Sequence, residues 1–465
     1  MMSYGFLLVS LAYVLSAVVV GLFELRRTRL NGIDVISLFV ALFMLQCCFS
    51  AATIYGLLPF LDPQNPTNVY AFDKILSQLD VPTAWLVFVL SAGFLLFFYV
   101  GCSLGRAALA HFASPSSEVL LISVNRGRIL AVLGVGLALT MYSFMLLDDT
   151  MVGRYINLIL LRSNDPQVER TALNANAFSL TQTWSWLSIV AIFCVVESRW
   201  RRLLLPPLLI VAVLFAVMGV SRRALFLPLL MAFLIVVLYR NRWNLRWIAM
   251  AALPLIVWVA FGKNLIASLA YDVSFETVAG TYHSWQSAVT RASSDVGITV
   301  VESVGTVGMI DIPPRLGEDH VLSMMRIFPE RTLGFEVDYP ERIVRISTTL
   351  LDDPDAADLP PGLMGQMWLD FRLAGPILWG IAFGLQMSIV QWLFERTRCT
   401  RQSSAIFVVL AFIVALPLNT GSFDFTFSVD TIGISVALIM CIKVGRARLV
   451  GVRQIEPKVQ PGIAR

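Results

Sequence analysis

Charged residues are scarce in this sequence. Only 14% of its 465 residues are Asp, Glu, Lys or Arg, whereas 57% are hydrophobic. A soluble domain carries about 25% charged residues, so a chain of this composition requires lipid as its solvent. Apolar runs of roughly 20 residues, the length that crosses a bilayer core as a helix, recur along the chain. The alternating pattern of a membrane β-barrel is missing, and helices are expected because lipid offers backbone groups no hydrogen-bond partners.

Residues that make disulfides or bind metals are also few. The six cysteines all fall in apolar runs or basic segments, so no disulfide framework is expected. His283 and His320 are not spaced like metal ligands and have no cysteine nearby. The sequence has no nucleotide-binding glycine loop and no internal repeat. We therefore expect no metal site, cofactor or nucleic-acid partner, while a divalent ion held by carboxylates is left open.

The apolar runs predict an all-α polytopic membrane protein of about eleven transmembrane helices. They lie at residues 4–23, 33–57, 82–101, 129–147, 181–197, 203–220, 224–239, 247–262, 373–394, 404–420 and 426–443. Every short connection on one side of this topology carries three basic residues. The positive-inside rule places that side and the C-terminus in the cytoplasm. The N-terminus and the long loop then lie outside, which is the periplasm of the inner membrane if the cell is a Gram-negative bacterium. No cleavable signal peptide is expected.

This topology divides the chain into four parts. Residues 1–262 hold eight helices with short periplasmic loops, 263–362 form a large periplasmic loop, 363–443 hold three helices, and 444–465 form a cytoplasmic tail. The large loop is expected to contain helices at 275–290 and 296–307. It has fifteen acidic and seven basic residues, so it is no general trap for anions. Anion binding there would depend on individually placed arginines.

Two arginines stand between two apolar runs on the predicted outer side. The segment Gly219-Val-Ser-Arg-Arg-Ala224 places Arg222 and Arg223 there, against the positive-inside bias. Charges at membrane depth are expensive and are usually retained for function. Arginine suits phosphate oxygens because its planar fork donates paired hydrogen bonds. The alternative is that both side chains extend to lipid headgroups or pair with a loop carboxylate.

Two further polar segments follow. Met324-Met-Arg-Ile-Phe-Pro-Glu-Arg-Thr-Leu-Gly334 groups Arg326, Glu330 and Arg331 around a proline, or is an ordinary solvated turn. Pro360-Pro-Gly-Leu-Met-Gly365 leads the chain back into the membrane, with Asp370 and Arg372 expected near the outer boundary. Those two residues either carry function or pair with each other and anchor the helix.

The order of these features resembles the Wzy-type oligosaccharide repeat-unit polymerases of bacterial surface polysaccharides. Gly-x-Ser-Arg-Arg-Ala is the best local match, and Phe23-Glu-Leu-Arg-Arg-Thr-Arg29 looks like the enterobacterial common antigen branch. Thr290-Arg291 matches a loop arginine of that branch. The family often has Asn-Phe-Gly where this chain has Asp370-Phe371-Arg372. The resemblance implies a GT-C-like polymerase/ligase architecture.

The resemblance also implies a reaction. Such a polymerase transfers a growing glycan en bloc from undecaprenyl pyrophosphate to a sugar hydroxyl of a new lipid-linked repeat unit, at the periplasmic face. Its implied partners are undecaprenyl-pyrophosphate-linked oligosaccharides, the lipid bilayer, a chain-length regulator (Wzz-type) and a flippase. Arginines would stabilise the departing pyrophosphate, and a general base would take the proton of the hydroxyl. The candidate arginines are Arg222, Arg223, Arg291, Arg326 and Arg331, and the candidate bases are Glu330, Asp370, His283 and His320.

Two other functions compete with polymerisation. An O-antigen ligase would transfer the same glycan to a lipid A core. A transporter of lipid-linked sugars would make no bond, but transporters concentrate ionisable residues near the bilayer midplane. The centres of the predicted helices in this chain are almost free of charge. Polymerisation is therefore the preferred hypothesis.

Overall fold

The computed structural model describes twelve stretches of the chain. They are residues 2–57, 79–111, 118–150, 153–154, 156–158, 180–196, 198–218, 222–241, 298–325, 348–349, 361–420 and 429–448. The first half contains α1 (Met2–Asn31), α2 (Val35–Phe43), the π-helix η1 (Met44–Phe49), α3 (Ser50–Leu57), α5 (Val81–His111), β1 (Glu118–Val124), α6 (Arg126–Met145), α9 (Thr181–Val196), α10 (Arg201–Met218) and α11 (Arg222–Arg240). The second half contains α15 (Ile298–Met309), α16 (Glu318–Met325), α19 (Gly362–Phe371), the 3-10 turn η4 (Arg372–Ala374), α20 (Gly375–Glu395), α21 (Arg401–Thr420), α22 (Val429–Cys441) and β2 (Ile442–Arg448).

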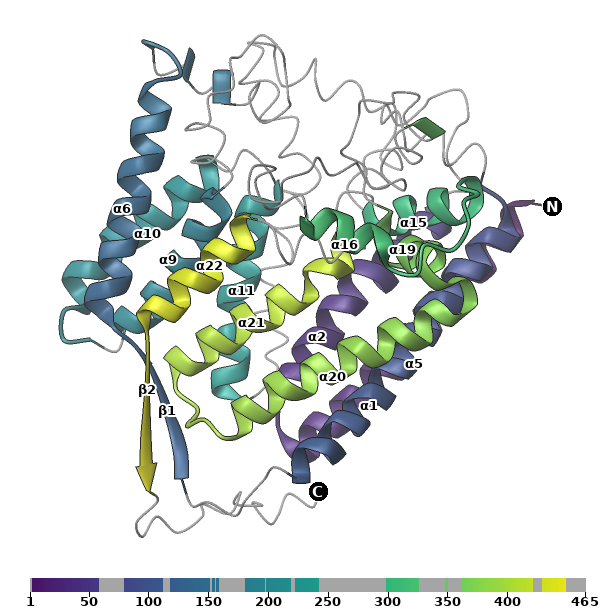
Figure 1. Ribbon diagram of the computed structural model, residues 1–465, viewed down its shortest axis with the longest axis horizontal. Helices are drawn as coiled ribbons and strands as arrows, with labels where there is room; N and C mark the ends of the chain where they lie inside the picture. Colours follow the sequence, from purple (N-terminus) through teal and green to yellow (C-terminus); the bar gives the residue numbers. More distant parts are fainter. Residues whose placement is uncertain are drawn as a thin grey trace, which may run out of the picture.

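The described chain is a helix bundle with the character of a membrane protein (Figure 1). Six helical segments are long and apolar enough to cross a bilayer. They are Tyr4–Leu30, Val35–Leu57, Val81–His111, Arg126–Met145, Gly362–Glu395 and Arg401–Leu418. Shorter apolar helices occupy three more predicted spans, at Thr181–Val196, Leu227–Arg240 and Thr431–Cys441. The predicted span 203–220 corresponds to α10, and the predicted span 247–262 lies outside the described residues, so the total of eleven stays a prediction.

Helices α5 and α20 pack backbone to backbone. Each helix presents two glycines four residues apart at the contact, Gly101 and Gly105 on α5 and Gly380 and Gly384 on α20. A Cβ built on Gly384 would lie 2.8 Å from the carbonyl carbon of Gly101, which no real side chain tolerates. Small residues at this spacing let transmembrane helices approach closely and gain dispersion contacts. The pair α5–α20 therefore fixes where α20 begins.

The predicted basic connections gather at one end of the bundle, here called the basic end. Arg27 donates two hydrogen bonds to Asp34, at 2.6 and 2.8 Å, and Arg106 lies 3.5 Å from the same carboxylate. Burial alone would raise the pKa of Asp34, but the hydrogen bonds and charge of Arg27 outweigh it and lower that pKa. Farther along, Arg128 donates to the carbonyl of Met440, and Arg401 stacks on the ring of Tyr239.

A two-stranded ribbon at the basic end departs from the all-α prediction. β1 and β2 pair antiparallel, with Leu120 opposite Arg446, and Figure 1 shows the ribbon leaving the bundle below α6 and α22. The other edge of β1 bonds to the turn after α20, because Leu120 donates to the Arg396 carbonyl and accepts from the Arg398 amide. Residues 444–448, predicted as tail, are thus ordered by partners more than 300 residues away in sequence, which no local pattern indicates.

The opposite end of the bundle, here called the cap end, carries α15, α16 and α19 (Figure 1). These helices come from the end of the predicted large loop and from the re-entry segment. α15 matches the helix predicted at 296–307. α15 packs on α19, because Gly365 lets the Thr306 side chain approach to within 2.8 Å of where a Cβ would stand. The cap end is thereby joined to α20 and to the α5–α20 pair.

We predict that Gly384→Val lowers stability by about 1–3 kcal/mol, because the added methyl groups meet the α5 backbone. The measurement is the thermal unfolding midpoint of the purified protein in detergent. Gly134→Val is the matched control, since a Cβ on Gly134 meets nothing within 4 Å. Equal unfolding midpoints for the two variants would show that the close α5–α20 contact is not required.

Candidate functional site

A backbone clasp surrounds the C-terminal end of α19 at the cap end. The amide of Arg315 donates to the Leu369 carbonyl at 3.0 Å, and the amide of Leu316 donates to the Asp370 carbonyl at 3.1 Å. In return, the Arg372 guanidinium donates to the Ile312 carbonyl. Helix ends leave carbonyls without intrahelical partners. The segment 312–317 satisfies them here and holds α16, which follows it, against α19.

Unusual backbone conformations concentrate at this clasp. Three described non-glycine residues have positive φ, and two of them are Leu316 at 52° and Arg372 at 53°. Gly317 and Gly362, which adjoin the clasp and the start of α19, also have positive φ. Each such non-glycine residue costs on the order of 1 kcal/mol, and such strain clusters at functional sites. The side chains that the clasp positions are therefore candidates for function.

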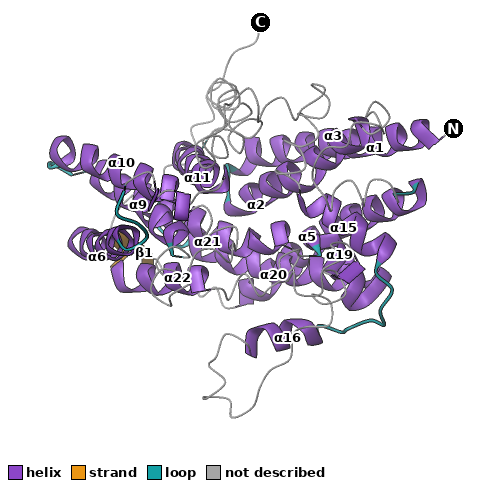
Figure 2. Cartoon of the chain, turned by 90° about the horizontal axis from the view of Figure 1, so that it is seen from above, coloured by secondary structure: helices purple, strands orange, loops and turns teal. Residues whose placement is uncertain are grey.

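A histidine and an aspartate meet inside the clasp. His320 Nε2 lies 3.0 Å from Asp370 Oδ2, and Gln366 Nε2 donates to Asp370 Oδ1 at 2.9 Å. The carboxylate of Asp370 is fully buried, and its two oxygens are thus both engaged. The imidazole also packs against Trp379 at the start of α20, with ring centroids 5.3 Å apart (Figure 2 shows α16 beside α19 and α20). The hydrogen bond with Asp370 fixes the orientation of the His320 ring.

This arrangement suits proton transfer by His320. When Nε2–H donates to Asp370, Nδ1 is the basic nitrogen of the neutral ring. The carboxylate then stabilises the imidazolium that forms when Nδ1 takes a proton, as in hydrolytic triads. Gln366, one helical turn before Asp370, holds the second carboxylate oxygen. The geometry thus places together a histidine, a carboxylate that orients it and an amide that holds the carboxylate.

Further buried charge lies around the pair. Arg315 contacts Glu318 at 2.9 Å and the fully buried Asp319 at 3.5 Å. On α15, Glu302 is 1% exposed, and it shares a helix face with Thr306, which packs on α19. Sequence reasoning missed Glu302, Arg315, Asp319 and Gln366. Sequence features could have indicated two of these residues. Gln366 stands four residues before Asp370, and Glu302 is a lone acid within an apolar helix.

The predicted site residues divide into three groups. His320 and Asp370 are described, and they are brought together although 50 residues separate them. Arg222 and Arg223 open α11, and only their backbone is described. Because α11 ends at Arg240 on the basic end, its first residues lie at the cap end. The remaining candidates fall outside the described residues: Glu330, His283, Arg291, Arg326 and Arg331.

One expectation about Asp370 and Arg372 is corrected. They do not pair with each other, since the salt bridge of Asp370 is to His320, and the backbone between α19 and η4 turns at Arg372 with a positive φ. Asp370 turns toward His320 and Gln366, whereas Arg372 lies over the ring of Trp368, 4.9 Å from its centroid. The ion pair between them, one of the alternatives that the sequence left open, is therefore wrong. Each residue has its own partners in the clasp.

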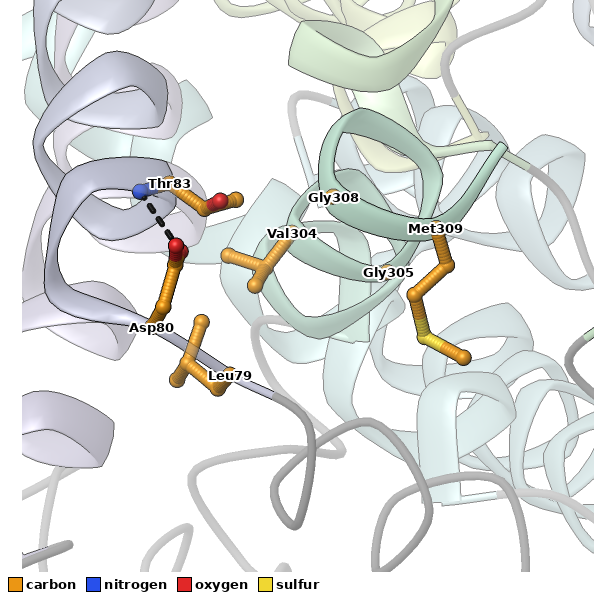
Figure 3. Close-up of a pocket in the computed structure, with 7 residues that line it drawn as sticks. All are labelled: Leu79, Asp80, Thr83, Val304, Gly305, Gly308 and Met309. Carbon is orange, nitrogen blue, oxygen red and sulfur yellow. Dashed lines mark hydrogen bonds between the residues drawn. The ribbon is translucent and has the colours of Figure 1, made fainter. Parts of the chain in front are cut away.

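A small cavity lies beside this site, between the start of α5 and α15 (Figure 3). It is lined by Leu79, Asp80, Thr83, Val304, Gly305, Gly308 and Met309 and measures about 80 Å³. Asp80 accepts a hydrogen bond from the Thr83 amide and so caps α5. Ligand sites usually measure about 300–1,000 Å³. This cavity is too small for a sugar, so we assign it to helix packing.

Comparisons with known proteins add no identity to this geometry. No family model, no curated protein and no solved structure matches the chain. Function must therefore be argued from the site itself.

We predict that Arg372→Gly and Arg372→Ala differ in stability. Both lose the contacts to Ile312 and Trp368, but only glycine removes the cost of the positive φ. Arg372→Gly should therefore be more stable than Arg372→Ala by about 1 kcal/mol. Thermal unfolding in detergent measures the difference, and equal stabilities would mean that the backbone at Arg372 is not strained.

Proposed function

We propose that this protein is a membrane glycosyltransferase that polymerises lipid-linked oligosaccharide repeat units at the outer face of a bacterial inner membrane. The observation that carries the proposal is the buried His320–Asp370 pair, held by the strained clasp at the end opposite the basic loops. A general base is what the hydroxyl of an acceptor sugar requires. The positive-inside rule assigns the basic end to the cytoplasm and the pair to the outer face.

The proposed reaction conserves atoms and charge. The acceptor hydroxyl attacks the anomeric carbon of the growing glycan, and its proton passes to Nδ1 of His320. The bond between the anomeric carbon and the phosphate oxygen breaks, and undecaprenyl pyrophosphate leaves. Asp370 stabilises the imidazolium, and Gln366 holds Asp370 in place. His320 then releases its proton to water. The lengthened glycan, still linked to the undecaprenyl pyrophosphate of the acceptor, is the donor of the next cycle, and a further lipid-linked repeat unit enters as acceptor.

The leaving group needs positive charge at the same end of the bundle. Pyrophosphate gains negative charge as the bond breaks, and fixed guanidinium groups stabilise it strongly where water is excluded. Arg222 and Arg223 begin α11 at the cap end, where a lipid-linked pyrophosphate would lie. Arg291, Arg326 and Arg331 are proposed to add to them from the large loop. The partly buried Arg315 is less suited, because it already faces Glu318 and Asp319.

Ligation to a lipid A core is the second candidate function. It would use the same donor and the same base, and it differs only in the acceptor. The two are separated by offering purified protein either a lipid-linked repeat unit or a core lipid. A ladder of products with the first acceptor supports polymerisation, and a single addition to the second supports ligation.

We predict that His320→Gln abolishes polymer formation and that Asp370→Asn lowers its rate by about 10²–10⁴-fold. The assay is the product ladder formed by protein in nanodiscs from isolated lipid-linked repeat units. Asp370→Asn should also move the acidic limb of the pH–rate profile to lower pH, because an amide does not stabilise imidazolium. A merely structural role for Asp370 would leave that profile in place.

The matched control is His111→Gln, since His111 is exposed at the end of α5. It should retain the wild-type ladder. Normal polymer from well-folded His320→Gln protein would overturn the assignment of the base.

A separate prediction concerns the leaving group. Arg223→Ala should abolish long polymer with normal protein levels, and Arg223→Lys should restore it only in part, because lysine lacks the planar fork. Chain lengths on gels of cell-surface polysaccharide measure both. Full activity with lysine would argue for a simple point charge, and wild-type chains with alanine would exclude Arg223 from pyrophosphate binding.

A further inference from the structure

No described residue pairs with the outer edge of β2, and hydrogen bonds identify which of its backbone groups face outward. Leu120 uses both its amide and its carbonyl to bond the turn at 396–398. These groups therefore point away from β2, so Leu120 and Arg446 form a non-hydrogen-bonded pair of the antiparallel ladder. By alternation, residues 443, 445 and 447 bond to β1. The backbone groups of Val444 and Arg446 point away from β1, and no described residue pairs with them.

The ribbon is held rigidly in this position. The amide of Val124 donates to the side chain of the buried Gln402 at 3.1 Å, and the amide of Asn125 donates to the Cys441 carbonyl at 2.8 Å. With the bonds of Leu120, these contacts tie the ribbon to the ends of α6, α20, α21 and α22. An edge fixed in advance loses little conformational freedom when another strand pairs with it.

Charge decides which kind of strand fits. β2 has the sequence Ile-Lys-Val-Gly-Arg-Ala-Arg, with three basic and no acidic residues. Antiparallel pairing with β2 of a second copy would bring like charges together, which is unfavourable. Basic residues on exposed edges are a known defence against such self-association. An acidic strand would instead gain from the same charges, and the 65% exposed Val444 offers it an apolar side chain to pack on.

We propose that the outer edge of β2 binds an extended acidic segment of another protein, which adds as a third strand. Main-chain hydrogen bonds to Val444 and Arg446 would supply affinity, as in other β-strand additions, and the basic residues would supply specificity. In the proposed topology this partner is cytoplasmic. The inference does not depend on the proposed enzymatic function, because the ribbon lies at the opposite end of the bundle from α16, the helix that carries His320 (Figure 1).

The test uses the full-length protein in phosphatidylcholine nanodiscs and a fluorescein-labelled heptapeptide of alternating Glu and Val. Fluorescence anisotropy should show saturable binding. A peptide of alternating Glu and Pro has the same charge but lacks the backbone donor at every second residue, and its proline rings disfavour strand pairing. It should bind at least tenfold more weakly. Equal binding of the two peptides, or no saturable binding of the first, would overturn the proposal.

Two variants locate the interaction. Val444→Pro removes an outward-facing amide without changing charge or the bonds to β1, and prolines are tolerated on strand edges; it should weaken binding at least tenfold. Val444→Thr keeps the amide and the branched shape, and it should bind like wild type. Peptide binding that is unchanged in Val444→Pro would contradict strand addition.

Hydrogen exchange provides a readout that needs no variant to fold. In the free protein, the amides of Val444 and Arg446 should exchange fast and those of Lys443 and Gly445 slowly, and the peptide should slow the first pair. Two other results would contradict the proposed acidic partner and identify a different one. A dimer by native mass spectrometry that Val444→Pro dissociates would point to a second copy. Protection at 444 and 446 only in nanodiscs with anionic lipid would point to the membrane surface.

Discussion

The contact between the backbones of α5 and α20 determines where the candidate site stands. Glycines on both helices let them meet without side chains between them, so little freedom remains for α20 to slide or rotate. Helix α20 begins only a few residues after α19, with Trp379 in its first turns against His320. The closely packed pair α5–α20 thereby places the polar cluster around His320 at one end of the bundle. Lipid cannot hydrogen-bond buried polar groups, so the protein must supply their partners.

Placing α20 directly after α19 requires a strained backbone at the junction between the two helices. Arg372 adopts a positive φ so that the chain can leave α19 and enter α20, and its guanidinium then holds the Ile312 carbonyl. Glycine is the residue that such a backbone favours, so the chain holds an arginine here against its conformational preference. At Asp370 a carboxylate faces His320, and a carboxylate can stabilise a charged histidine as an amide cannot.

Sequence patterns predict the helical spans well because each depends on a local run of apolar residues. α15 and the re-entry at Gly362 are likewise indicated by composition and by glycine and proline. His320 and Asp370 are predicted as separate candidates, but their hydrogen bond is not, because it depends on the clasp between residues 312–317 and the end of α19. The ribbon could not be predicted for the same reason. β2 follows α22 without a break, and it is a strand only because β1, far away in sequence, pairs with it.

The two ends of the bundle handle charge in opposite ways. At the basic end, Arg27 is neutralised by Glu24 and Asp34, and the hydroxyl of Tyr99 completes the network, so these charges join α1, α2 and α5 and leave no group for chemistry. At the cap end, Glu302, Asp319 and Asp370 are buried, whereas the described arginines there are only partly buried, and Asp370 has a histidine as its partner. A histidine can take up and release a proton near neutral pH, whereas arginine cannot. The basic end is therefore built for anchoring, and the cap end is the part of the described molecule at which proton transfer is chemically accessible.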